Sequence, residues 1–476
     1  MKKIWILFLC FSSLTIQAKD YYVTPADISK LKEILGNNTL RPGDEVILRD
    51  GIYTGLGEVD FSARGTNTDS IKLRAEHAGK AVISGALKMR VYGQYLQMEG
   101  LFFHKAWAKD LCMIEFQKED GVYASHCRFT NCVMDDCNDP DKSEKPVKGV
   151  DPITVSEYWL GLHGKNIRID HCYFANKRIG GLILQIWLNE YDHLNNHQID
   201  HNIFGARQPY GGNGAEIIRI GNSWSSQLES HTLVEDNVFL HCDGENEIIS
   251  VKSCHNILRR NLFFESRGGL VCRHGHDNIL ESNTFVGNNI EGTCGIRLIN
   301  QGHTVYDNLL CRLGGFGLLV RMGIYERPNA STDIQKEPLT SYHRAENIDI
   351  SHNAFIDCKT IDLGSGSGDK EPRNVRLAYN YFSNKTNNIR IFYPEKTLSG
   401  FYFMENRYIW ADGLIIKSPG FKRLLQAENH DAKEQTRVRE CLEKAGAVWY
   451  PSTAKDIRYI LSTVSYTHLT LPTILL

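Results

Sequence analysis

One phrase recurs along this chain: an aliphatic residue, two mostly polar positions, an asparagine, and an apolar pair that usually ends in an aromatic residue. Its asparagines are separated by 35, 24, 22, 25, 45, 27 and 26 residues, and the shortest spacings cluster in the low twenties. A repeat of about 20 to 50 residues indicates a solenoid or a related array. The asparagines that define these copies are Asn202, Asn237, Asn261, Asn283, Asn308, Asn353, Asn380 and Asn406.

Each repeat unit holds short β-rich runs broken by Asn, Gly and Asp, and no unit shows the periodicity of an amphipathic helix. The sequence therefore predicts an all-β fold, a right-handed parallel β-helix over residues 19–420. In such a fold the repeated asparagine is structural. Its side chain tolerates the left-handed backbone of a tight turn, and stacked amides can hydrogen-bond from coil to coil.

A solenoid needs its ends covered. The segment Ile28–Leu35 predicts a short N-terminal capping helix. Residues 421–463 predict a C-terminal helical cap or linker, with helical spacing of apolar residues between Lys422 and Lys444. Three stretches without the repeat phrase predict long side loops that form binding walls or lids: Asp135–Asp151, Tyr325–Ala345 and residues 364–368.

The N-terminus has two lysines, an apolar run from Ile4 to Ile16 and a small residue at Ala18, which is the pattern of a secretory signal peptide over residues 1–18. We therefore expect a secreted or periplasmic protein, and no later segment is apolar for long enough to span a membrane. At the other end, residues 464–476 resemble a translated adaptor sequence and are interpreted as non-native read-through.

Composition narrows the class of protein further. A formal net charge of −2 gives no global basic field, so nucleic acid is not an expected partner. Thirteen cysteines in an exported chain first suggest disulfide bonds. Three of them recur within repeat units at 254, 272 and 294, which favours stacked buried thiols over bridges.

Polar residues that recur at one-coil spacing are the candidates for chemistry, because a β-helix places them on neighbouring strands about 4.8 Å apart. Glu245 and Glu247 point to one face of an extended strand. Lys252 follows, Arg273 lies 21 residues later, and Arg297 lies 24 residues after that. With Asn213 and Arg219 one coil earlier, these residues predict an oxygen-rich patch beside a cationic ladder.

That combination suits β-elimination at a uronic acid in an acidic polysaccharide. A hard cation held by oxygen ligands neutralises the substrate carboxylate, and a lysine in a positive cluster has a lowered pKa and can act as a base. The spacing alone leaves a second interpretation open, in which the alternating charges are a solvated face with weak ion pairs.

Four ordered segments of this cluster resemble polysaccharide lyase family six, which contains alginate lyases and chondroitinase B. They are residues 213–221 (NGAEIIRIG), 245–253 (ENEIISVKS), 273–275 (RHG) and 295–300 (GIRLIN), and the likeness runs from about Tyr22 to about residue 420. One departure is Ala215, where many relatives carry Gly.

The resemblance implies a role for each residue. Lys252 is the general base and Arg273 the general acid. Substrate contacts are assigned to Arg297, His274 and Arg219. The Ca²⁺ ligands are Asn213, Glu245 and Glu247. The residues of these motifs are more similar to those of alginate lyases than to those of chondroitinase B, so alginate is the expected substrate.

Three alternatives remain open at this point. The first is a chondroitinase B-type lyase acting on dermatan sulfate. The second is a glycoside hydrolase, which needs two carboxylates around the scissile bond, with Asp135 and Asp136 as the candidate pair. The third is a non-catalytic β-helix that only binds glycans. The sequence does not determine the oligomeric state.

Overall fold

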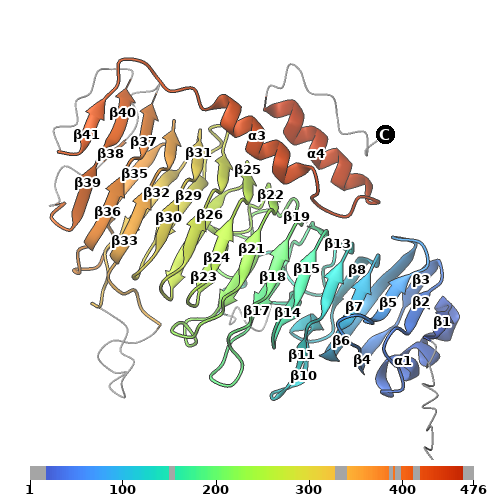
Figure 1. Cartoon of the computed structure of the whole chain (residues 1–476). Coiled ribbons are helices and arrows are strands. Elements are labelled where there is room, and N and C mark those ends of the chain that lie inside the picture. The colour runs from blue at the N-terminus through green and yellow to red at the C-terminus, as the bar shows by residue number, and fades with distance from the viewer. Residues whose placement is uncertain are drawn as a thin grey trace, which may run out of the picture.

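The computed structural model describes residues 18–149, 156–326, 340–384, 390–391, 398–410 and 419–464. The chain winds into a long parallel β-helix, which confirms the predicted fold class (Figure 1). Almost all of the predicted signal peptide at 1–18 and of the suspect tail at 464–476 lies outside the described residues. Among the described residues, no helix is long and apolar enough to cross a membrane.

The first face of the solenoid is a sheet of 14 strands in which each strand pairs in parallel with the copy one coil away. Its strands, in order, are β1 (Asp20–Val23), β2 (Glu45–Leu48), β5 (Ile71–Ala75), β7 (Leu96–Glu99), β12 (Arg128–Thr130), β15 (Arg168–Asp170), β18 (Gln198–Asp200), β21 (Leu233–Glu235), β24 (Ile257–Arg259), β27 (Ile279–Glu281), β30 (Thr304–Tyr306), β33 (Glu346–Ser351), β36 (Arg373–Ala378) and β39 (Phe401–Met404).

The second face follows directly after the repeated asparagines and begins with a long strand, β6, that it shares with the third face. Its strands are β3 (Gly51–Thr54), β6 (Ala81–Gln94), β8 (Phe102–Ala108), β13 (Val133–Asp135), β16 (Tyr173–Ala175), β19 (Ile203–Phe204), β22 (Val238–Leu240), β25 (Leu262–Phe264), β28 (Thr284–Val286), β31 (Leu309–Cys311), β34 (Ala354–Ile356), β37 (Tyr381–Asn384), β40 (Asn406–Trp410) and β41 (Phe421–Arg423).

The third face carries the predicted chemistry. Its strands are β4 (Gly57–Arg64), β9 (Cys112–Glu115), β14 (Tyr158–Leu162), β17 (Leu184–Ile186), β20 (Ile218–Gly221), β23 (Glu247–Lys252), β26 (Gly268–His274), β29 (Thr293–Leu298), β32 (Phe316–Arg321), β35 (Thr360–Ser365) and β38 (Arg390–Ile391). A short antiparallel hairpin, β10 (Gln117–Glu119) and β11 (Val122–Ser125), lies beside it.

The repeated asparagines form an unbroken amide ladder at the corner between the first and second faces. Each side-chain Nδ2 donates to Oδ1 of the next asparagine at 2.9–3.1 Å, from Asn202 through to Asn406. The ladder was predicted, but the backbone role was misassigned. The left-handed residue is the one before each asparagine, such as His201 (φ 55°) and Ser282 (φ 54°).

Inside the coils, aromatic rings stack on their own copies. Phe174, Phe204, Phe239, Phe263 and Phe285 follow one another with ring centroids 4.4–5.2 Å apart. The 12 cysteines of the described residues are all free and mostly buried, as predicted. They do not stack on one another at 254, 272 and 294, because Cys272 pairs with Val251 and Leu298 on the neighbouring strands.

The N-terminal capping helix is present. A turn of 3₁₀ helix (Pro25–Asp27) leads into α1 (Ile28–Gly36), which buries Leu31, Ile34 and Leu35 at the end of the solenoid.

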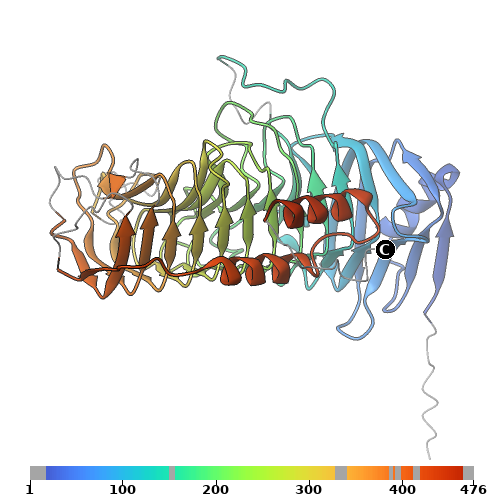
Figure 2. The same ribbon diagram turned by 90° about the horizontal axis from the view of Figure 1, so that it is seen from above.

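The C-terminal helices differ from the prediction in place and in boundary. Residues Phe421–Arg423 form a last strand, and the helices are α3 (Asp431–Leu442) and α4 (Pro451–Thr463). They lie along the flank of the second face and not across the end of the solenoid (Figure 2). The reason is an apolar stripe on the outside of that face, including Ile203, Leu240 and Phe264, which pairs with Val438, Leu442 and Ile460 of the helices.

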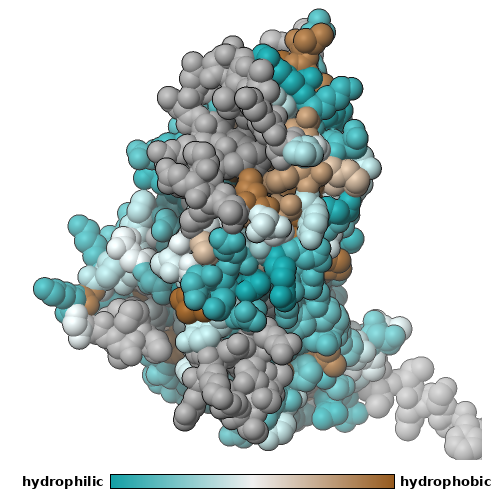
Figure 3. Space-filling view, turned by 90° about the vertical axis from the view of Figure 1, so that its left-hand side faces the viewer, coloured by the Kyte–Doolittle hydropathy of each residue, from teal (hydrophilic) through white to brown (hydrophobic). Residues whose placement is uncertain are grey.

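The end of the solenoid that carries β36 to β41 is viewed in Figure 3, where hydrophobic residues are exposed in small patches among hydrophilic ones. Within the described part of the chain no helix covers that end (Figure 1). Of the two roles predicted for residues 421–463, a helical cap or a linker, α3 and α4 do not fill that of a cap over this end.

Candidate active site

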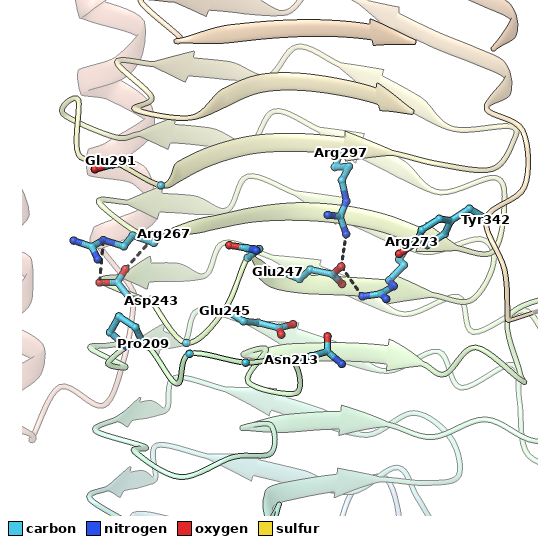
Figure 4. Close-up of a pocket in the computed structure, with 15 residues that line it drawn as sticks. Pro209, Asn213, Asp243, Glu245, Glu247, Arg267, Arg273, Glu291, Arg297 and Tyr342 are labelled. Carbon is cyan, nitrogen blue, oxygen red and sulfur yellow. Dashed lines mark hydrogen bonds and ion pairs between the residues drawn. The ribbon is translucent and has the colours of Figure 1, made fainter. Parts of the chain in front are cut away.

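A cavity of about 740 Å³ opens on the outside of the third face, where β23, β26 and β29 follow one another (Figure 4). Five of the eight predicted site residues line it: Asn213, Glu245, Glu247, Arg273 and Arg297. The remaining three, Lys252, His274 and Arg219, are not lining residues. The other lining residues are Pro209, Gly211, Gly212, Asp243, Gly244, Asn246, Arg267, Glu291, Gly292 and Tyr342.

Glu247 is the point at which the cationic side chains converge. It begins β23, is 4 % exposed, and accepts a hydrogen bond from Arg273 Nη1 at 2.9 Å and a second from Arg297 Nη2. Ser250 Oγ donates to its other oxygen at 2.5 Å. Burial alone would raise the pKa of Glu247, but Arg297 and Arg273 outweigh it and hold the pKa below its ordinary value. Glu247 is therefore an anchored carboxylate.

The single cationic ladder expected from spacing is not what the strands form. Lys252 pairs in register with His274, because the strand pairing slips by one residue and leaves Arg273 in the irregularity. Arg297 pairs with Val271 and not with Arg273. A count of residues per coil cannot detect such a bulge, which inserts one residue and redirects the side chain. The two arginines meet through Glu247 and not through strand register.

Lys252 ends β23 and is 8 % exposed. Its pKa is lowered to about 8, first by burial and then by the positive charges of Arg219 and Arg273. Between the residues that the structure describes, its ammonium group forms no hydrogen bond or ion pair. A buried lysine with this pKa exchanges a proton near neutral pH, which an ordinary lysine does not.

A second feature of the site is a crowd of carboxylates. One oxygen from each of Glu216, Glu245 and Glu247 lies within 4.8 Å of the others. The pKa of Glu245 is raised to about 8 by burial and by the negative charges of Glu216 and Glu247. Its Oε1 is buried without a hydrogen-bond partner, while Oε2 accepts from the Gly214 amide at 3.0 Å.

This donor set fits a divalent cation. Carboxylate oxygens are the ligands that Ca²⁺ prefers, and an unpartnered buried carboxylate oxygen in a like-charged group is what such an ion would satisfy. Asn213, predicted as a ligand, is exposed and lies on the same side of the cavity as Glu245 (Figure 4). Glu216 was missed, although it lies inside the motif that contains Asn213. It is bound by Arg219 through hydrogen bonds of 2.9 and 2.8 Å.

Tyr342 was not singled out as a site residue, although the stretch that contains it was predicted to form a binding wall or lid. It belongs to a predicted side loop and lines the cavity over Arg273, whose guanidinium carbon is 5.8 Å from the ring centroid. The ring also stacks on His274 at 5.9 Å. Asn300 holds this loop to the coil, since it accepts from the His343 amide at 3.0 Å and donates to the Arg273 carbonyl at 3.1 Å.

His274 is buried, and the pKa of its imidazole is lowered to about 3, first by burial and then by Lys252 and Arg273. It is therefore neutral at any pH at which the protein would work. Its Nδ1 is buried and has no hydrogen-bond partner. A neutral ring with an unused nitrogen can donate or accept a hydrogen bond but cannot supply charge.

The carboxylate pair considered for a hydrolase lies elsewhere. Asp135 belongs to β13 on the second face, under the C-terminal helices, where it accepts from Tyr450 Oη at 2.5 Å and from Asn176 at 2.7 Å. Asp136 is paired with Arg178. Both carboxylates are engaged in holding the fold together, and neither lines the cavity. This arrangement removes the basis of the hydrolase alternative.

Comparison with known proteins identifies relatives over nearly the whole chain. A family model described as chondroitinase B matches residues 27–409. A mannuronic-acid-specific polysaccharide lyase of family 6 from human gut microbiota is 54% identical, covers 93% of this chain and 99% of its own, and superposes with a TM-score of 0.90. The PL6 family alginate lyase AlyGC is 31% identical over 91% of this chain and 59% of its own, with a TM-score of 0.77.

A third structure, the PL6 family polysaccharide lyase Pedsa3628 from Pseudopedobacter saltans, shares the fold at 23% identity, with 87% of this chain and 95% of its own covered and a TM-score of 0.66. No curated protein sequence matches the chain.

Proposed function

Because the chain belongs to the chondroitinase B family, polysaccharide lyase family six, we propose that it cleaves alginate by β-elimination at the cavity on the third face. The observation that carries the proposal is one arrangement. A buried lysine with a pKa of about 8 lies beside an arginine anchored by Glu247, next to a cluster of three carboxylates. Elimination needs a base, a group for the leaving oxygen and charge to offset the substrate carboxylate.

Lys252 is the proposed base. In its neutral form the ammonium has become an amine that accepts the C5 proton of a uronate residue. The electrons of the C5–H bond form a double bond between C4 and C5, and the C4–O bond to the leaving sugar breaks. Burial and the nearby arginines keep a usable fraction of Lys252 neutral, which an exposed lysine at the same pH would not have.

Arg273 is the proposed acid. Burial alone would lower its pKa, but the charge and hydrogen bond of Glu247, together with Tyr342 and Glu216, outweigh burial and raise the pKa. A guanidinium of this kind does not lose a proton to water, but it can lose one to an alkoxide, which is a much stronger base. Water has a pKa of about 15.7, and sugar hydroxyls are of the same order, so a proton moves from arginine to a fully developed alkoxide at little energetic cost. We therefore expect proton transfer to lag behind cleavage of the C4–O bond.

We assign the cation to Asn213, Glu245 and Glu247. Glu216 joins this set because one of its carboxylate oxygens lies within 4.8 Å of an oxygen of Glu245 and of Glu247. When bound, Ca²⁺ would supply positive charge against the substrate carboxylate. The protein's own charges support the same end, since Arg273 and Arg297 together carry one positive charge more than Glu247 removes. Arg297, Arg219 and His274 are the proposed substrate contacts, with neutral His274 restricted to hydrogen bonding.

Alginate is chosen over dermatan sulfate because the relative that is 54% identical over 93% of the chain is described as specific for mannuronic acid. Mannuronate-rich alginate is therefore the first polymer to test. Secretion is proposed on the leader pattern of residues 1–18.

The test follows the unsaturated product, which absorbs in the ultraviolet. Purified protein is incubated with mannuronate blocks, guluronate blocks and dermatan sulfate, each with Ca²⁺ or with a chelator. The proposal predicts absorbance growth on alginate, fastest on mannuronate blocks, and a loss of rate after chelation that added Ca²⁺ reverses. An increase in absorbance on dermatan sulfate alone would show that dermatan sulfate, and not alginate, is the substrate. Cleavage without absorbance would contradict elimination.

A further inference from the structure

A second group of potential metal ligands lies outside the cavity, at the corner where the third face turns into the first. His255, His276 and Asp277 each offer one ligand atom, and these atoms lie within 4.8 Å of one another. They come from two successive coils, since the backbone amide of His255 donates to the carbonyl of His276 at 3.1 Å. We propose that these three residues bind a divalent transition metal ion such as Zn²⁺, at a site separate from the carboxylate cluster.

The donor types favour this class of ion. Imidazole nitrogens suit Zn²⁺, Cu²⁺ and Ni²⁺, whereas Ca²⁺ and Mg²⁺ take oxygen ligands. Two imidazoles and one carboxylate are a common set of three protein ligands around zinc, with water in the fourth position. The site therefore differs in chemistry from the group of Glu216, Glu245 and Glu247, which has no nitrogen ligand.

The geometry needs a modest adjustment. In a tetrahedral shell with bonds of about 2.0–2.2 Å, two ligand atoms lie about 3.3–3.6 Å apart, so atoms that are now up to 4.8 Å apart must approach by as much as about 1.5 Å. The side chains of His255, His276 and Asp277 are 35%, 26% and 48% exposed, so rotation of partly exposed side chains can supply this movement.

Charge and space support the same conclusion. Glu229 adds a carboxylate with Oε1 3.8 Å from His255 Nε2, so two negative charges face the site once both imidazoles are neutral. Asp277 already holds the His276 ring through Nδ1 at 2.6 Å. On the next coil Gly302 leaves the room that this carboxylate occupies, because a Cβ there would lie 2.0 Å from Asp277 Oδ1.

The position gives the site a structural consequence. His255 follows Lys252 by three residues and His276 follows Arg273 by three, so one ion would join the ends of the two strands that carry them. Binding of the ion would tie these coils together without touching the cavity. It does not depend on the reaction assigned to the cavity.

The experiment measures Zn²⁺ binding by titration calorimetry on the full chain, with Ca²⁺ in excess to occupy the carboxylate cluster. The variant is His255→Asn, because residue 255 has φ 58° and asparagine tolerates that conformation. The matched control is His201→Asn. His201 has φ 55° and stacks on His171 at a ring distance of 5.0 Å, as His255 stacks on His231 at 5.3 Å. His276→Ala and Asp277→Asn complete the set.

We expect one Zn²⁺ per wild-type chain and unchanged binding in His201→Asn. Affinity should fall at least about tenfold in His255→Asn and His276→Ala, and less in Asp277→Asn. A thermal melt gives a second readout: Zn²⁺ should raise the midpoint of the wild type and of His201→Asn but not of His255→Asn. No Zn²⁺ binding to the wild type, or equal binding to His255→Asn and the wild type, would overturn the proposal.

Discussion

Two regions of this solenoid bury polar side chains at the same coil spacing, with opposite results. In the asparagine ladder every amide is satisfied, since each Nδ2 donates to the next Oδ1 and to a backbone carbonyl such as that of Leu258. In the cavity, Glu245 Oε1, Arg273 Nε and Arg297 Nε are buried without a hydrogen-bond partner. The hydrogen-bonding groups of the ladder are satisfied by the folded chain itself, whereas those of the cavity need a bound ligand to satisfy them.

The difference separates structure from function in a repeat protein. A polar residue that recurs in every coil finds its partner in the neighbouring coils and needs nothing else. The cavity residues occur once each, so no copy of themselves lies above or below, and the register also slips between β23 and β26 and between β26 and β29. Groups left unsatisfied at such a cost are available to a substrate and a cation.

The largest effect on turnover is expected for Lys252→Met, which keeps the length of the side chain and removes the base. General base catalysis contributes about 10²- to 10⁴-fold, so kcat on alginate should fall by that factor with little change in KM. The measurement is the rate of ultraviolet absorbance at saturating substrate.

The control is Lys177→Met. Lys177 is also buried, and its pKa is lowered to about 7, first by burial, but its charged neighbours are Glu157 and Arg207 and not the Arg219 and Arg273 that act on Lys252. This variant should lose stability and keep its kcat. Equal losses of kcat in both variants would mean that a buried lysine matters here for folding and not for chemistry.

A smaller loss is expected for Glu247→Gln. The amide accepts weakly from Arg273 and Arg297 and is a poorer ligand for Ca²⁺, so half-maximal activity should require roughly 10- to 100-fold more Ca²⁺. A calcium titration of the initial rate measures this. Glu291→Gln, on the far side of the same cavity in Figure 4, should leave the titration unchanged. A shift in both would indicate a diffuse effect of charge.

The pH dependence of kcat/KM should follow Lys252. Its pKa is lowered to about 8, so the protonated form dominates at lower pH and the active neutral form appears as pH rises through that value. Between pH 7 and pH 8 the neutral fraction grows roughly fivefold, and the rate should grow with it. A rate that falls over this range would contradict the assignment of the base.

The smallest effect on turnover is expected in the ladder. Asn283→Ala removes the acceptor of the buried Asn261 backbone N–H, and it takes one of two partners from Asn261 Nδ2 and from Asn308 Oδ1, at a cost of about 1–3 kcal/mol in the free energy of unfolding. The melting temperature should fall while kcat stays unchanged. A lower kcat at a temperature where the variant remains folded would show that ladder and cavity are coupled.

The sequence predicted the fold because the repeat is strict. Copies of one phrase forced one architecture, and the ladder and α1 followed from elementary properties of asparagine and of an amphipathic segment. The conformation at the corner was misassigned by one residue, because an asparagine beside a left-handed residue and one in that conformation give the same pattern.

Five of the eight predicted site residues line the cavity, but the contacts between them were not predicted. Spacing brought Lys252, Arg273 and Glu247 together, while the bulge in β26 and the convergence on Glu247 depend on how two strands slip. Tyr342 comes from a loop without a repeat, and no periodicity reports on such a residue. The C-terminal helices were predicted as a cap or a linker and not as a cover for the flank, because their partner surface, the apolar stripe on the second face, was not recognised.

Those helices change how the whole chain can fold. A solenoid is held together by contacts between adjacent coils and can assemble one coil at a time. Here Tyr450 bonds Asp135 and Trp449 Nε1 bonds the Asn131 carbonyl, across more than 300 residues of sequence. Arg437 of α3 forms an ion pair with Asp307, which lies several coils further along the solenoid than Asp135. During synthesis the apolar flank of the early coils stays exposed until α3 and α4 have been made, so completion of this surface is slow, non-local and shared by all the coils that the two helices cover.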